Sequence, residues 1–154
     1  MKTNYYYRSR EWPYKNVKPR IIIEKYMEDK NSKTMRDYKF FCFNGKPEIL
    51  YVSDGSHTDN QKIAFFDKNF VQLPIKRTDY NDFEVLPQKP RNFAKMKELS
   101  ALLSKGIPHL RVDWYEINGK LYFGELTFTP AGGMYTSETK IEGKSMSEFL
   151  DVGC

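Results

Sequence analysis

The sequence predicts an α+β fold, in which an antiparallel β-sheet carries one main amphipathic helix packed on it. Three observations lead to this class. Phe, Trp and Tyr make up 16% of the chain, a high share that favours strands. Asn44-Gly45 separates two apolar runs, as in a tight β-hairpin. Only residues 91–106 carry a sustained three- and four-residue apolar repeat, which is typical of a helix.

The first half of the chain is read mainly as strands. Residues 1–19 are polar, aromatic and basic, and we expect a loop or short helix there. RIIIEKYM, residues 20–27, is a β-branched run with a charged end, so a buried strand is expected. Further runs of this kind predict strands at 37–43, 47–54, 63–67 and 70–74. Residues 75–90 show no clean period and predict an irregular linker.

The main helix is predicted at RNFAKMKELSALLSKG, residues 91–106. Its apolar side chains recur at helical spacing and are Phe93, Met96, Leu99, Leu102 and Leu103. Gly106 is placed to end the helix, and Pro108 prevents its continuation. A short final helix is expected near SMSEFL, residues 145–150.

Residues 110–133 predict a second hairpin with an unusual polar content. One strand carries Arg111 and Asp113, and the other carries Glu125 and Thr127. A hairpin built only for stability would alternate apolar residues with neutral or paired ones. These four residues are therefore the first candidates for a functional site.

The turn of this hairpin decides which faces the four residues occupy. A two-residue turn at Asn118-Gly119 would place Asp113 and Glu125 on opposite faces of the sheet. A three-residue loop, with Gly119 as the left-handed residue of a bulge, would bring all four onto one face. We predict the three-residue loop, because it leaves a better core on the other face. Tyr115 and Phe123 would then join the polar face, and the core face would hold Leu110, Val112, Trp114, Tyr122, Leu126 and Phe128.

Two carboxylates on one half-buried sheet face repel each other unless a cation neutralises them. Arg111 is one such cation, and it would make this a purely structural, ion-paired face. Mg²⁺ is the other, because it prefers oxygen ligands and leaves room for substrate phosphates. The spacing of the residues leaves both interpretations open.

Three blocks of the chain together resemble a known family. They are KPRIIIEKYMED, DYKFFCFNGKP and RVDWYEINGKLYFGELTFTP, within residues 10–150. In this order they resemble the TupA-like ATP-grasp family, which is associated with teichuronopeptide and capsular polysaccharide synthesis. The resemblance implies that residues 20–154 form a C-terminal ATP-grasp lobe. Residues 1–19 would then be an N-terminal arm or the remnant of a preceding lobe.

The resemblance also implies roles for the hairpin residues. Asp113 and Glu125 would be the Mg²⁺ ligands that hold the nucleotide phosphates. Thr127 stands where broad ATP-grasp enzymes usually have an asparagine, and it would be a third oxygen ligand. Arg111 would be the catalytic residue that stabilises an acyl phosphate or tetrahedral intermediate, since a guanidinium beside Mg²⁺ suits developing negative charge.

Upstream of the hairpin, the resemblance implies a nucleotide site. Glu24, Lys25, Tyr26 and Met27 resemble the hinge whose backbone N–H and C=O groups contact the adenine edge. Asp37 and Lys39 lie on the next predicted strand, where the family presents polar residues toward ribose and phosphates. ATP and Mg²⁺ are the cofactors implied.

The implied activity is ATP-dependent carboxylate–amine ligation in cell-surface polysaccharide biosynthesis. A polysaccharide precursor, amino acid or sugar acid would be phosphorylated on its carboxylate and then attacked by an amine. ATP-grasp enzymes hold ATP between two lobes, and the first lobe supplies phosphate-binding lysines and a Gly-rich flap. Residues 1–19 contain no Gly, so we expect a separate or missing N-terminal lobe, and weak nucleotide binding by this chain alone.

Other functions stay open at this point. The net charge of +5 and the pI of about 9.1 suit a phosphate-rich or anionic partner. The chain would then be a non-catalytic accessory lobe that binds an anionic glycan or a partner chain. A glycosyltransferase-associated protein is a further alternative, although the sequence contains no Asp-x-Asp motif for a sugar nucleotide.

The remaining sequence features bear on the cellular compartment and on the expected partners. MKTNYYYRSREW lacks the apolar core of a signal peptide, and no apolar run approaches the length of a membrane span. The only cysteines are Cys42 and Cys154, so a disulfide framework is not expected. We therefore expect a cytoplasmic protein. YYYRSREWPYK mixes bases and aromatics as single-strand nucleic-acid binders do, but a docking arm is the favoured interpretation and nucleic acid is not an expected partner.

Overall fold

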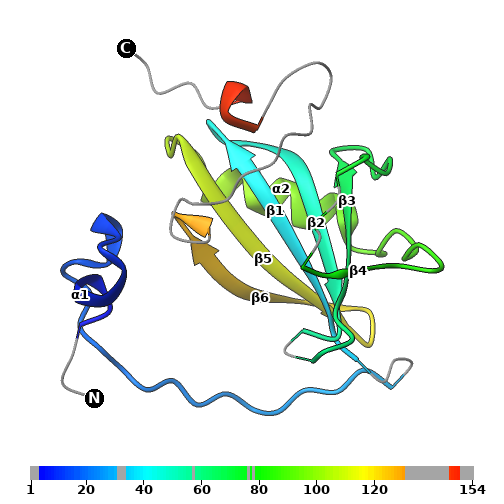
Figure 1. Cartoon of the computed structure of the whole chain (residues 1–154), viewed down its shortest axis with the longest axis horizontal. Coiled ribbons are helices and arrows are strands. Elements are labelled where there is room, and N and C mark those ends of the chain that lie inside the picture. Colours follow the sequence, from blue (N-terminus) through cyan, green and yellow to red (C-terminus); the bar gives the residue numbers. More distant parts are fainter. Residues whose placement is uncertain are drawn as a thin grey trace.

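The structure is a computed structural model that describes residues 4–30, 34–56, 58–75, 77, 79–130 and 146–149. It shows an α+β fold, so the predicted class is confirmed (Figure 1). A six-stranded sheet has the order β4-β3-β2-β1-β5-β6 and is antiparallel except at the short β3–β4 pair. Its strands are β1 (Arg36–Phe43), β2 (Lys46–Asp54), β3 (Lys62–Asp67), β4 (Asn81–Asp82), β5 (His109–Ile117) and β6 (Lys120–Thr127). The main helix, α2 (Phe93–Leu103), packs on one face.

The first hairpin forms as the sequence predicts. β1 and β2 pair as far as Phe43 and Lys46, and the turn between them is Asn44-Gly45. The backbone φ angles of these two turn residues are 50° and 78°, both in the left-handed region that such a turn requires. Of the non-glycine residues, Asn is among those that tolerate this region best. The hairpin places Asp37 and Lys39 of β1 next to the central strand β5.

The alternation of side chains along the strands divides the core into two clusters. The cluster under α2 contains Tyr38, Phe40, Cys42, Leu50, Val52, Ala64, Phe66, Phe93, Met96, Leu110, Val112 and Trp114. The cluster on the opposite face contains Phe41, Phe43, Ile49, Tyr51, Ile63, Phe65 and Ile75. Asp37, Lys39, Arg111 and Asp113 alternate with helix-side residues and therefore belong to the second face.

Helix α2 departs from the predicted apolar stripe at its C-terminal end. Phe93, Met96 and Ser100 are buried, whereas Leu102 is 67% exposed. Ser100 lies in the core because the indole N–H of buried Trp114 donates to its hydroxyl at 2.8 Å. The prediction of an apolar stripe that includes Leu102 and Leu103 was wrong, because Ser100 and Ser104 are the buried residues at this end of the helix and the two leucines lie on its exposed side.

The segment at residues 20–27 is not a strand in this structure, so that prediction was wrong. It is extended, as β-branched residues favour, but it pairs with none of the six strands. In Figure 1 it runs clear of the sheet. Central strand β1 already has β2 and β5 as its two neighbours, which leaves this segment no place in the middle of the sheet.

Two other strand predictions can be compared with the structure. Residues 63–67 lie in β3, as predicted. Residues 70–74 form only an isolated bridge between Phe66 and Gln72, because the Asp67 carboxylate accepts bonds from the Asn69 and Val71 N–H groups and turns the chain. Near residues 145–150, the described part is a 3₁₀ turn, η3 (Met146–Phe149).

The N-terminal arm docks beside the end of β6. It contains α1 (Tyr6–Ser9) and a 3₁₀ turn, η1 (Trp12–Tyr14), as expected for a loop or short helix. The Tyr14 ring packs edge-on against Phe128 with centroids 6.3 Å apart, and Thr129 donates a hydrogen bond to Glu11. Within the described ranges, no helix has the length and apolar character needed to cross a membrane.

Candidate functional site

The β5–β6 turn has two residues, so the predicted three-residue loop was wrong. Ile117 pairs with Lys120, and Asn118 and Gly119 have φ angles of 52° and 74°. The Asn118 side chain also gives this turn a second role. It donates to the Glu28 carbonyl at 3.1 Å and accepts from the Lys30 N–H at 3.0 Å.

A β-bulge further along the hairpin nevertheless restores the shared face. Trp114 pairs with Phe123, but Val112 pairs with Leu126. One residue of β5, Asp113, is therefore opposed by two residues of β6, Gly124 and Glu125. After the bulge, each side chain of β6 lies on the opposite face from the one it would occupy without the extra residue, because a one-residue shift exchanges the two faces. The four polar residues thus meet on one face, as predicted, although the bulge and not the turn brings them together.

The position of the bulge also explains why two aromatic residues of β6 do not lie on their predicted faces. Before the bulge, Tyr122 pairs with Tyr115 and lines the open face of the sheet. Phe123 pairs with Trp114 and contacts its indole edge-on, with centroids 5.8 Å apart. Each of these two side chains therefore lies on the face opposite to the one that the sequence predicts.

The bulge depends on Gly124. A Cβ added at this position would lie 3.0 Å from the Asp113 carbonyl oxygen and 3.1 Å from a ring carbon of Tyr115. Contacts this short require the backbone or the aromatic ring to shift. Gly124 therefore allows β6 to approach β5 closely at the point where Glu125 is turned toward Asp113.

Arg111 joins the two carboxylates of the hairpin. Its Nε and Nη2 lie 2.7 Å and 2.8 Å from the two carboxylate oxygens of Asp113, and Nη2 also bonds Glu125. Thr127 donates its hydroxyl to the same Glu125 oxygen at 2.7 Å. This bidentate arrangement is the ion-paired face that the sequence left as one of two interpretations.

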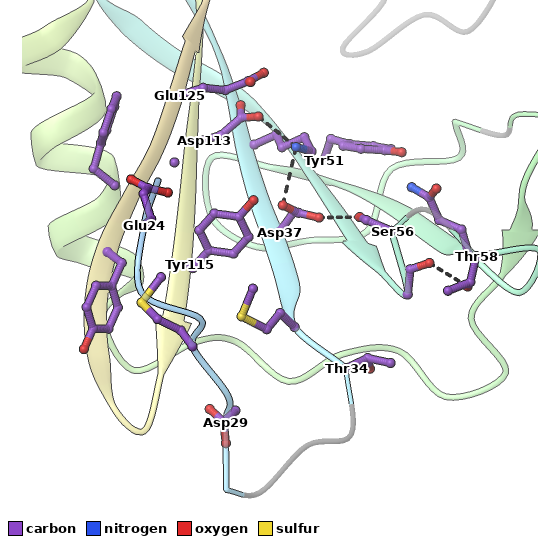
Figure 2. A pocket seen from close by; sticks show the side chains of 18 of the residues that line it. Glu24, Asp29, Thr34, Asp37, Tyr51, Ser56, Thr58, Asp113, Tyr115 and Glu125 are labelled. Carbon is purple, nitrogen blue, oxygen red and sulfur yellow. Dashed lines mark hydrogen bonds and ion pairs between the residues drawn. The ribbon is translucent and has the colours of Figure 1, made fainter. Parts of the chain in front are cut away.

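Lys39 extends the ion-paired cluster to β1. Its Nζ lies 2.8 Å from Asp113 and 3.6 Å from Asp37. Asp37 also accepts hydrogen bonds from Ser53, at 3.1 Å, and from Ser56. In Figure 2, dashed lines run from Asp113 and from Asp37 to the same nitrogen atom, and a third dashed line joins Asp37 to Ser56.

Sequence reasoning missed two members of this cluster, Ser53 and Ser56, and it placed Tyr115 on this face without giving it a role. Ser53 pairs directly with Asp37 across β1 and β2, so the predicted register of the first hairpin contained the signal. Burial raises the pKa of the Tyr115 hydroxyl, and its hydrogen bond to Asp37 raises it further. Tyr115 therefore stays protonated and orients Asp37.

Burial has the largest effect on the pKa values of Asp113 and Arg111. Asp113 is 1% exposed, and this burial raises the pKa of its carboxyl while Arg111 and Lys39 oppose the rise. With two cationic donors bonded to it, Asp113 is ionised at neutral pH. For Arg111, burial lowers the pKa, but the hydrogen bond and charge of Asp113 outweigh it and the net shift is upward.

A cavity of about 1360 Å³ lies over this cluster, between the open sheet face and residues 24–30. Its lining includes the predicted hinge residues Glu24, Lys25, Tyr26 and Met27, and also Asp37, Lys39, Arg111, Asp113 and Glu125. Figure 2 shows Glu24 and Asp29 on the bordering segment and Asp37, Asp113 and Tyr115 on the strands. Thr127 is not among the lining residues, but its hydroxyl donates to Glu125, which is.

The donor set for a metal is small. Among the described residues, no three His, Cys, Asp or Glu side chains are arranged to hold one ion. Asp113 and Glu125, with the Thr127 hydroxyl, offer the hard oxygen atoms that Mg²⁺ prefers. Three carboxylates, including Asp37, face the two cations Lys39 and Arg111, so the cluster carries one net negative charge. Donor type and charge therefore fit a Mg²⁺ ion that arrives with phosphates.

His109, at the start of β5, makes the stability of the fold depend on pH. It lies beside the rings of Phe41 and Phe43, with Nδ1 3.1 Å from the Phe128 carbonyl oxygen. Burial lowers the pKa of His109, the bond to Phe128 opposes this, and the charge of Arg111 lowers it further. The folded state thus favours the neutral ring. The contribution of neutral His109 to stability is complete above the pKa of histidine in the unfolded chain, which is about 6.5. It is lost as the pH falls below that pKa.

Replacing His109 with Gln is expected to flatten the pH dependence of stability between about pH 5 and 7. The free energy of unfolding would be measured by urea titration at several pH values. In the wild type it should fall on acidification, because the unfolded chain binds a proton that the folded chain resists. An equal slope in the variant would show that another group is responsible.

The fold and the site together define an α+β protein with a charged, ligand-sized cavity on the open face of its sheet. The sequence profile of the TupA-like ATPgrasp family matches residues 1–147, so the chain belongs to the TupA-like ATP-grasp family. ATP-grasp proteins generally bind ATP and Mg²⁺. No curated protein and no solved structure matches the chain significantly.

Proposed function

We propose that the chain is a Mg²⁺-ATP-dependent carboxylate–amine ligase of the ATP-grasp type, or a lobe of one, in cell-surface polysaccharide biosynthesis. One observation carries the proposal. Residues 24–27, distant in sequence from the hairpin, line the same cavity as Arg111, Asp113 and Glu125. A nucleotide could therefore contact an extended backbone at one end and a charged cluster at the other.

Each end of the cavity has a proposed role. The extended backbone of Glu24, Lys25, Tyr26 and Met27 offers N–H and C=O groups to the adenine edge. Asp37 and Lys39 lie on β1 beside β5 and line the same cavity, and they would contact ribose and phosphates. Asp113 and Glu125, supported by Thr127, would hold Mg²⁺, which would neutralise phosphate charge and polarise the transferred group.

Lys39 and Arg111 act as internal counter-ions in this proposal. Both oxygens of Asp113 are engaged by these two cations. Phosphate oxygens compete for the same donors, because Lys and Arg bind phosphate strongly. As Lys39 and Arg111 turn toward phosphate, Asp113 regains free oxygen atoms. Nucleotide and metal would then bind together more tightly than either alone.

The reaction would transfer the γ-phosphoryl group of ATP to a substrate carboxylate. An amine then attacks the acyl carbon, an amide bond forms, and phosphate leaves, so that ADP and phosphate are released. Arg111 lies where it would stabilise the negative charge that develops on the reacting oxygens. Amino acids, sugar acids or polysaccharide precursors with a carboxylate are the proposed substrates.

The proposed organisation follows the same scheme. Residues 1–19 form an arm docked on β6, and residues 20–154 form the C-terminal lobe. A separate N-terminal lobe would supply further phosphate contacts and exclude water from the cavity. A reaction that consumes ATP places the protein in the cytoplasm in this proposal.

Mg²⁺-ATP binding by the purified chain is expected to weaken about tenfold or more in Asp113→Asn and Glu125→Gln, which is about 1.4 kcal/mol per tenfold change. Glu98→Gln is the matched control, because Glu98 pairs with Lys95 on α2, on the opposite face of the sheet, and does not line the cavity. Ligand-detected NMR titration with and without Mg²⁺ suits the weak affinity of a single lobe. Glu125 is partly exposed, so its variant tests binding without disturbing the core.

Unchanged Mg²⁺-ATP affinity in both carboxylate variants would contradict the proposed site. One observation favours a second candidate, a non-catalytic lobe that binds an anionic glycan. Arg111 and Lys39 already neutralise Asp113 without a metal. Binding of a uronic-acid polymer that ignores Mg²⁺ but falls steeply with salt would support that candidate.

A further inference from the structure

The most exposed apolar feature of the described chain is a run of three isoleucines. Ile21, Ile22 and Ile23 are 82%, 80% and 91% exposed. Consecutive apolar residues on an extended backbone point to opposite sides, so both faces of this segment are apolar. A strand with this pattern normally lies in a sheet that is covered on both faces.

Hydrogen bonds anchor this segment near both of its ends. On the N-terminal side, the Asn4 amide donates to the carbonyls of Lys15 and Val17 at 2.9 Å and 3.2 Å. On the C-terminal side, Asn118 donates to Glu28 and accepts from Lys30. The two anchors limit the conformations of the segment between them, so pairing with another strand costs less conformational entropy.

The charges that flank the isoleucines specify how such a strand can pair with itself. Arg20 precedes the run and Glu24 follows it. In a two-fold antiparallel pair centred on Ile22, Arg20 of each copy lies opposite Glu24 of the other copy. A parallel pair would instead place Arg20 opposite Arg20 and Glu24 opposite Glu24, which is destabilising.

We propose that residues 20–24 form a homodimer interface, in which two copies of this chain pair antiparallel about Ile22. Backbone N–H and C=O groups along the facing edges supply the hydrogen bonds, as at other open strand edges. Ile22 meets Ile22 on one side of the ribbon, and Ile21 meets Ile23 on the other. Glu24 also lines the cavity, so the interface borders the site in each copy.

Cysteine cross-linking tests the register. In a Cys154→Ser background, Ile22→Cys is expected to form a disulfide dimer under mild oxidation. The two Cα atoms of a directly opposed pair are about 4.5 to 5.5 Å apart. Ile21→Cys is the matched control, since its two copies are offset by two residues along the ribbon and lie beyond disulfide reach. Equal cross-linking of the two variants would overturn the proposed register.

A charge exchange tests the pairing without cysteine. Arg20→Glu or Glu24→Arg alone is expected to raise the dimer dissociation constant about tenfold, since each creates like-charge pairs. The double variant Arg20→Glu/Glu24→Arg should restore the wild-type constant, because every opposed pair is again of opposite sign. Sedimentation equilibrium measures all four proteins. A wild type that stays monomeric to about 200 µM, a concentration at which even micromolar affinity gives dimer, would overturn the proposal.

Discussion

Replacing Arg111 with Met is expected to lower the free energy of unfolding by about 3 to 5 kcal/mol. Asp113 is 1% exposed, and it would lose two of its three charged hydrogen bonds while its own charge stayed buried. Urea unfolding followed by circular dichroism measures the loss. Arg36→Met is the control, because the pair with Asp54 is partly exposed and should contribute less than about 1 kcal/mol.

A second substitution shows whether the loss arises from the buried charge. Asp113→Asn in the Arg111→Met background removes the uncompensated carboxylate, so part of the lost stability should return. The coupling between the two positions is then the difference between the double variant and the sum of the single variants. Additive effects would contradict the ion pair as the source of stability.

Gly124→Ala is expected to destabilise the protein by about 1 to 3 kcal/mol and to weaken Mg²⁺-ATP binding as well. The added Cβ would lie 3.0 Å from the Asp113 carbonyl oxygen, so β6 must move away from β5 at the bulge. Glu125 would then lose its alignment with Arg111 and Asp113. Urea unfolding and NMR titration with Mg²⁺-ATP measure the two effects.

Gly106→Ala is the matched control for Gly124. A Cβ at Gly106 meets nothing within 4 Å, and only its φ of 76° resists the change. It should cost about 1 kcal/mol and leave nucleotide binding intact. If both glycine variants lose stability equally and both retain binding, close approach at the bulge does not position the carboxylates.

Much of the fold could be predicted from the sequence where a local signal has one physical outcome. Asn44-Gly45 supplies two residues that accept a left-handed backbone, and the hairpin formed there. The periodic run that contains Phe93 and Met96 formed α2. The prediction of a strand at residues 20–27 failed because its local signal has more than one physical outcome. β-branched residues favour an extended backbone, but no sequence pattern shows whether another strand lies beside it.

The candidate site was predictable in its members and not in its geometry. Even spacing on each strand indicated that Arg111, Asp113, Glu125 and Thr127 belong together. The shared face arises from a bulge opposite Asp113, and such a bulge depends on a close approach of two backbones that spacing does not reveal. Ser53 and Ser56 were missed because neutral hydroxyls carry no charge pattern, and they became evident only as donors to buried Asp37.

The two anchors of the segment that borders the cavity limit how that segment can move. The Asn4 contacts fix one end beside Val17, and the Asn118 contacts fix the other beside Glu28. A chain stretch pinned at two points can swing about the line that joins them, but it cannot slide along the sheet. Movement of this segment would therefore change the width of the cavity mouth, and a spectroscopic distance from residue 24 to the hairpin would measure that change.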